Sequence, residues 1–136
     1  MQSIELSRVV DAPASRVGDA ITDVEPFMRA AGFDEVTHEG DRLDIAKALG
    51  LLKISLSLRI VDDPEAVLAY EQLEGVFETM TTAYTLSETS DGTDVTVRTE
   101  FGLDVPGGSI LDGTIIKRQR RKEIEAQFDY LQAELE

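Results

Sequence analysis

Three charged side chains stand where the sequence pattern predicts an apolar strand face. Arg8, Lys47 and Glu78 each have apolar residues two positions before and two positions after them. Alternate residues of a β-strand share a face, so all three are predicted to point toward the concave side of a sheet. A buried charge needs a partner or a polar ligand head. Arg8 and Glu78, together with Tyr84, are therefore the candidate catalytic or ligand-orienting residues. The alternative is that the strands bend or end there and the charges reach water.

Few other residues could form a conventional catalytic or metal site. The chain has no cysteine, which excludes disulfides, thiolate metal sites and cysteine nucleophiles. Its single histidine, His38, lies beside the turn signal at residues 39–41 and is expected to face solvent, so no Ser-His-Asp triad is predicted. The adjacent carboxylates Asp62 and Asp63 are interpreted as solvated surface and not as a calcium site. We therefore predict no metal site and no cofactor.

The charge balance narrows the range of partners. Thirteen basic residues against 27 acidic residues give a net charge of −14. Such a surface repels nucleic acid, which we exclude as a partner. The acidic residues are scattered along the chain and only four of the basic residues are lysines, a composition that resembles proteins of salt-loving archaea. An ordinary, well-solvated acidic protein is the alternative.

Length and hydropathy predict one domain spanning residues 1–136, because a chain of this size fits a single core. No apolar run approaches the ~20 residues that cross a bilayer. The first residues alternate and lack a charged-then-apolar leader. A cytoplasmic location without a membrane span is therefore expected.

The elements that must position these side chains begin with a strand at residues 3–10. A helical stretch follows Pro13, and Asp23 looks like the N-cap of a second short helix that Gly32 ends. Six further strand-like runs come next, and the short links between them require an antiparallel sheet. These runs are residues 33–38, 42–49, 53–61, 66–73, 76–86 and 95–103.

The last predicted element, residues 109–136, is one amphipathic helix of roughly 25 residues. It is the only element long enough to cover the apolar face of a seven-stranded sheet. Its apolar residues are dense in the second half and sparse in the first, so an apolar pocket is expected beneath the first half. Its mouth is expected near the short helix that carries Phe27 and the strand that carries Met80 and Tyr84. A filled core without a cavity is the alternative. The predicted ligand-binding residues are Phe27, Phe33, Leu56, Leu58, Met80, Tyr84, Phe101, Leu111 and Ile115.

Residues 117–122 of this helix contain five of the 13 basic residues. We interpret them as a solvated helix face that pairs with neighbouring glutamates. The alternative is a docking patch for an acidic partner, for a second subunit in a homodimer, or for an anionic headgroup.

Four stretches of the chain resemble the START-like or Bet v 1-like superfamily, also called the SRPBCC or polyketide cyclase/dehydrase superfamily. They are V-V-D-A-P at residues 9–13, V-x-x-x-I-T-D at 17–23, the hairpin at 86–97 and the Pro/Gly-started helix at 106–135. The resemblance implies a helix-grip α+β fold, in which a curved seven-stranded antiparallel sheet surrounds a long C-terminal helix and two short helices follow the first strand. Members include lipid-binding proteins, ligand carriers, quinone-binding proteins and aromatase/cyclases, so the fold leaves the function open.

Three functions are therefore considered. The first is binding of a small hydrophobic or amphipathic ligand, such as a lipid, an isoprenoid quinone or an aromatic or polyketide-like metabolite. The second is a cyclase/dehydrase-like enzyme that uses Arg8, Glu78 or Tyr84. The third is a protein-interaction module that uses the basic helix face at 117–122.

Overall fold

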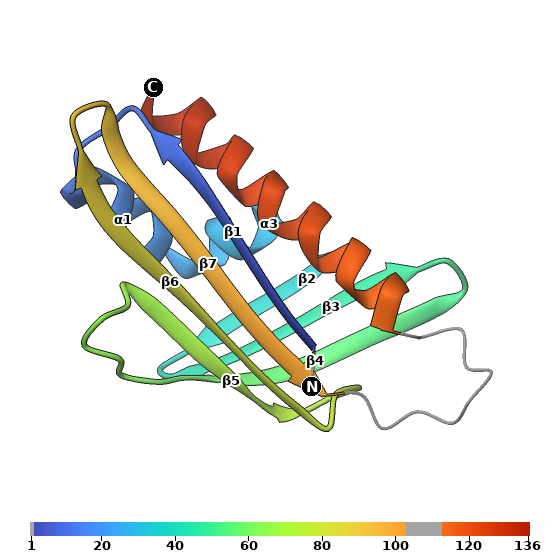
Figure 1. Cartoon of the computed structure of the whole chain (residues 1–136). Coiled ribbons are helices and arrows are strands. Elements are labelled where there is room, and N and C mark those ends of the chain that lie inside the picture. Colours follow the sequence, from blue (N-terminus) through green and yellow to red (C-terminus); the bar gives the residue numbers. More distant parts are fainter. Residues whose placement is uncertain (1, 103–112) are drawn as a thin grey trace.

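The computed structural model describes residues 2–102 and 113–136, and its helices and strands follow the predicted order (Figure 1). A first strand and two short helices come before six more strands, and a long helix ends the chain. The elements are β1 (Gln2–Val10), α1 (Ala14–Thr22), α2 (Val24–Ala30), β2 (Glu35–Glu39), β3 (Arg42–Leu49), β4 (Leu52–Ile60), β5 (Leu68–Glu74), β6 (Thr79–Thr89), β7 (Gly92–Gly102) and α3 (Gly113–Leu135).

The seven strands form one antiparallel sheet in the order β1-β7-β6-β5-β4-β3-β2. The sheet is curved, and α3 runs along its length next to β1 (Figure 1). The helices α1 and α2 connect the two edge strands, β1 and β2, and pack against α3. This confirms the predicted helix-grip α+β fold, with a long C-terminal helix and two short helices after the first strand.

The alternation of apolar residues determines which face of the sheet is buried. On β7, alternate residues are fully buried, namely Thr93, Val95, Val97, Thr99 and Phe101, whereas the residues between them are partly or fully exposed. The turn that enters β7 depends on Gly92, whose φ is 139°. A Cβ atom there would lie 2.2 Å from the backbone oxygen of Val10, so only glycine fits this position.

The strand predicted at residues 76–86 begins only at Thr79, because residues 75–78 form a bend. The Gln72 side chain holds the bend. Its Nε2 donates to the Phe77 carbonyl oxygen at 2.8 Å, and its Oε1 accepts from the Phe77 backbone N–H at 3.2 Å. Glu78, at the end of the bend, is exposed. Leu103 of the last predicted strand and residues 109–112 of the predicted helix lie outside the described residues.

Candidate ligand-binding site

A cavity of about 50 Å³ lies between the first half of α3 and the side of the sheet formed by β3, β4 and β5. This volume holds a few water molecules or a short apolar chain. Its position beneath the first half of the terminal helix agrees with the prediction. The predicted mouth is not where the cavity lies, because Met80 lines the cavity but Phe27 and Tyr84 do not. The lining residues come from the sheet, from the 75–78 bend, from α3 and from the segment that precedes β2. They are Phe33, Ile45, Lys47, Ile54, Leu56, Tyr70, Val76, Phe77, Met80, Ile116, Gln119, Arg120 and Glu123.

Most of the cavity wall is apolar. Leu56 and Met80 are buried, and the Phe77 ring packs against Phe101 with the ring centroids 5.2 Å apart. Phe33 and Val76 are only half-buried, so the cavity approaches the protein surface on their side. A wall of this kind favours an apolar molecule, because its binding removes apolar surface from water.

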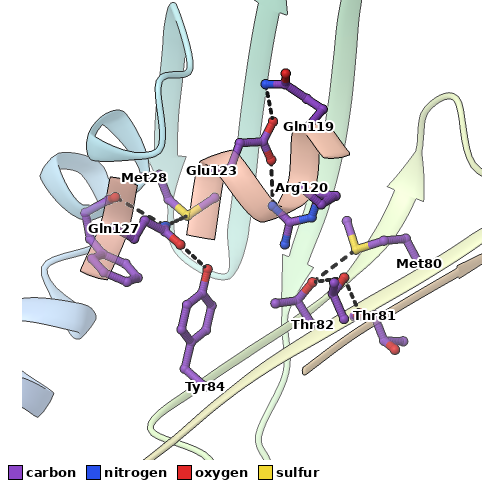
Figure 2. Close-up of polar contacts among 11 residues, drawn as sticks. Met28, Met80, Thr81, Thr82, Tyr84, Gln119, Arg120, Glu123 and Gln127 are labelled. Atoms are coloured by element: carbon purple, nitrogen blue, oxygen red, sulfur yellow. Dashed lines mark hydrogen bonds and ion pairs between the residues drawn. The ribbon is translucent and has the colours of Figure 1, made fainter. Parts of the chain in front are cut away.

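The helix α3 supplies a polar section of the wall. Arg120 Nη1 donates to Glu123 Oε1 at 2.6 Å, and Gln119 Nε2 donates to Glu123 Oε2 at 3.1 Å. Figure 2 shows the Arg120 side chain extending from α3 toward Met80 and Thr82 of β6. The Arg120 and Glu123 side chains are only 10% and 6% exposed. Both charges are almost fully shielded from water, so the free energy of burying them depends on the polar groups around them.

Two nitrogen atoms of Arg120 have no acceptor in the described part of the chain. Its Nε and Nη2 are buried and make no hydrogen bond to any residue that the structure describes. Burial acts to lower the pKa of the guanidinium, but Tyr70 and Glu123 outweigh burial, and the pKa is raised above its ordinary value. Arg120 therefore stays charged. The residue contributes to the cavity wall, but Nε and Nη2 themselves are buried donors that remain unused.

Lys47 adds a second cation to the wall, where it is partly buried. Its Nζ lies close to Gly32, 3.0 Å from the position that a Cβ atom would take there. Within residues 2–102 and 113–136, the Lys47 side chain makes no hydrogen bond or ion pair. Lys47, Arg120 and Glu123 give the wall two cations and one carboxylate, a net charge of +1. The whole chain, by contrast, carries −14.

A second buried polar network links β6, α3 and α2. The Tyr84 hydroxyl donates to Gln127 Oε1 at 2.8 Å, and Gln127 Nε2 donates to the Phe27 carbonyl oxygen at 3.3 Å (Figure 2). Burial is the main cause that raises the pKa of Tyr84 well above its ordinary value, and Tyr70 adds to it. The phenol therefore stays protonated and donates a structural hydrogen bond.

Tyr84→Phe tests this network. The change would leave a buried acceptor on Gln127 without its donor, so we expect the free energy of unfolding to fall by about 1–3 kcal/mol. The raised pKa of Tyr84 also determines how the stability of the protein changes with pH. Its contribution to stability is present below the unfolded-state pKa of about 10 and is lost as the pH rises above that value. Urea unfolding should show a steeper alkaline loss for the wild type than for Tyr84→Phe, and equal losses would contradict this role.

The structure places the predicted ligand-binding residues in different environments. Three of them, Phe33, Leu56 and Met80, line the cavity. Ile115 is 38% exposed, and Leu111 lies outside the described residues. The remaining four are fully buried and are not among the residues that line the cavity: Phe27, Leu58, Tyr84 and Phe101.

The three candidate catalytic residues do not meet at one site. Arg8 faces α3, where its Nη1 donates to Asp129 Oδ1 at 2.5 Å and its guanidinium lies 5.1 Å from the centre of the Phe128 ring. Glu78 is exposed at the bend, and Tyr84 is buried against Gln127. None of the three lines the cavity. Arg8 connects the first strand to the terminal helix.

Sequence reasoning missed the polar wall because it treated residues 117–122 as one exposed basic face. Arg118 and Arg121 are indeed exposed, but Arg120 is buried. The signal was present in the helical spacing, since Arg120 lies four residues after Ile116 and four before Ile124, on the buried stripe. Reading the stripe without regard to residue type would have identified Arg120.

The seven-stranded sheet, its terminal helix and the cavity between them define a protein with the START-like, or Bet v 1-like, fold. No family model and no curated protein sequence matches the chain. A solved structure from Thermus thermophilus is similar, with a TM-score of 0.78 and 18% identity, covering 97% of this chain and 95% of that one. A START superfamily protein from Mycobacterium smegmatis has a TM-score of 0.77 and 11% identity, with coverages of 98% and 96%. The aromatase/cyclase Zhui from a Streptomyces species has a TM-score of 0.75 and 17% identity, with coverages of 96% and 93%.

Neither a metal-binding cluster nor a membrane-spanning helix is found among the described residues. No group of three or more His, Cys, Asp or Glu side chains in this part of the chain is placed to hold a metal ion. Among the described helices, none is long and apolar enough to cross a membrane.

Proposed function

We propose that the chain binds a small hydrophobic or amphipathic molecule in the cavity beneath the first half of α3. The observation that carries this proposal is an apolar cavity with polar side chains converging on one section of its wall. A lipid, an isoprenoid quinone and an aromatic or polyketide-like metabolite each combine an apolar body with a polar end. The similar folds of a START superfamily protein and an aromatase/cyclase support a ligand-binding role.

The size of the cavity limits what enters without rearrangement. A volume of about 50 Å³ accepts a short chain. A larger lipid or quinone requires movement of the side chains at the more exposed end of the cavity, where Phe33 and Val76 are half-buried. Rotation of these two side chains moves fewer packed atoms than rotation of the buried Leu56 or Met80.

Filling the cavity tests the proposal. Val76→Trp places a large ring at the cavity wall, so we expect the affinity for hexanol, an apolar probe with one hydroxyl, to fall by about tenfold or more. The measurement is the shift of the Met80 and Ile54 methyl resonances during a hexanol titration.

Val9→Trp is the matched control, because Val9 lies on β1, is 42% exposed and does not line the cavity. It should bind hexanol as the wild type does. If hexanol leaves the resonances of the cavity unchanged in the wild type, or binds equally to Val76→Trp, the proposed function is wrong.

The other two hypotheses have less support. A cyclase-like activity through Arg8, Glu78 or Tyr84 would need these groups at the ligand, and none of them lines the cavity. An interaction surface at residues 117–122 loses Arg120 to the interior. The cytoplasmic location, the halophilic source and the homodimer stay predictions from the sequence.

A further inference from the structure

We infer that the ligand carries a carboxylate on its apolar body, and that Arg120 binds this carboxylate at the α3 wall of the cavity. The inference rests on the proposed function, because it assigns a chemical class to the molecule in that cavity. It makes Arg120 and Lys47 the residues that select an acid over a neutral molecule of the same shape.

One edge of the Arg120 guanidinium is unused. Of the Arg120 nitrogens, only Nη1 donates to Glu123, at 2.6 Å. The two nitrogens without an acceptor, Nε and Nη2, lie on the same edge of the planar group. A carboxylate binds such an edge through two parallel hydrogen bonds, and charge assistance makes these bonds stronger than neutral ones. The structure therefore leaves this edge without an acceptor and buried next to the cavity, and a carboxylate reaches it when the side chains that cover it move.

The residues around Arg120 do not supply the missing acceptor. Glu123 is engaged through both oxygens, since Gln119 Nε2 donates to its Oε2 at 3.1 Å. The buried hydroxyl of Thr82 already pairs with Thr99 at 2.9 Å and with Met80 Sδ at 3.4 Å. A buried donor without an acceptor is costly. An acceptor on the ligand would satisfy Nε and Nη2 of Arg120.

The charge of the cavity wall also favours an acidic ligand. Lys47 and Arg120 outnumber the single carboxylate of Glu123, so the cavity is positive within a strongly acidic chain. A neutral ligand would leave this excess cation in an apolar site, whereas a monocarboxylate neutralises it. The surrounding acidic surface slows the approach of an anion. The higher affinity for a carboxylate must therefore come from contacts inside the cavity.

The test compares hexanoate with hexanol, which share a chain length and differ in the head group. We expect the full-length wild type to bind hexanoate at least about tenfold more tightly than hexanol at neutral pH. In the variant Arg120→Gln with Glu123→Gln, which keeps the net charge and the Lys47 cation, this preference should fall severalfold, to about threefold or less. Hexanoate should also shift the Nε–H resonance of Arg120, which is assigned by its loss in the variant.

The matched control is Arg121→Gln with Glu125→Gln, an exposed pair on the same helix that gives the same net charge. It should keep the full preference for hexanoate. If the buried double variant does not fold, Lys47→Met provides the independent test, and the preference should drop severalfold because the second cation is gone.

The outcomes separate the two proposals. If hexanol binds in the cavity but hexanoate has no advantage, the carboxylate inference fails and the proposed function stands. If the buried double variant or Lys47→Met folds and keeps the full preference, the assignment to these cations fails. If neither probe binds, the proposed function fails with it.

Discussion

Glu123→Leu is expected to lower the free energy of unfolding by about 3–5 kcal/mol, because it leaves the buried charge of Arg120 without its carboxylate. The Arg120 side chain is 10% exposed and pairs with Glu123 at 2.6 Å. Its other nitrogens have no acceptor among the described residues, so the loss of Glu123 removes its only anionic partner there. Urea unfolding at neutral pH measures the change.

Two further variants make this result specific. Glu125→Leu on the exposed side of α3 should change stability by no more than about 0.5 kcal/mol. Arg120→Met combined with Glu123→Leu should recover most of the loss, because two apolar side chains replace a buried ion pair. A fall of less than about 1 kcal/mol for Glu123→Leu would mean that Arg120 reaches water, and would remove the electrostatic basis of the site.

The fold was predictable because its signals are periodic and local. Strand alternation, the Ser90–Gly92 turn and the helical spacing of Ile124, Phe128 and Leu131 each imply one element, and short links permit only antiparallel pairing. The start of β6 was not predictable in this way. It depends on hydrogen bonds from Gln72 to a residue five positions away, and no periodic pattern encodes such a contact.

The location of the site could be predicted from the sequence, but many of the residues that line it could not. Period-2 geometry indicates that Tyr84 and Phe101 face the helix, yet it does not tell whether a side chain meets a cavity or another side chain. Both are filled-core residues, since Tyr84 contacts Gln127 and Phe101 contacts Phe77. Residue type misled the assignment of Arg120, because a charged residue is assumed to be exposed unless its helical position is considered first.

Phe27→Ala is expected to lower the free energy of unfolding by about 3–5 kcal/mol, because it opens a void in a packed part of the core. Phe27 is fully buried, and its ring lies 5.3 Å from Tyr84 in an edge-to-face arrangement and 6.4 Å from Tyr130. The shortened side chain would remove both aromatic contacts. Chemical denaturation measures the loss, and a change below about 1 kcal/mol would show that the site collapses around alanine.

The same variant decides whether Phe27 belongs to the core or to the ligand site. We expect Phe27→Ala, under conditions where it is folded, to bind hexanol in the cavity within about twofold of the wild type. Phe33→Ala, the matched change at a half-buried residue that lines the cavity, should lose less stability and bind hexanol more weakly. Binding is read from the Met80 and Ile54 methyl resonances, because the void left at Phe27 can itself take up an apolar probe. A severalfold loss in Phe27→Ala with no loss in Phe33→Ala would move the ligand toward α2 and away from the Arg120 wall.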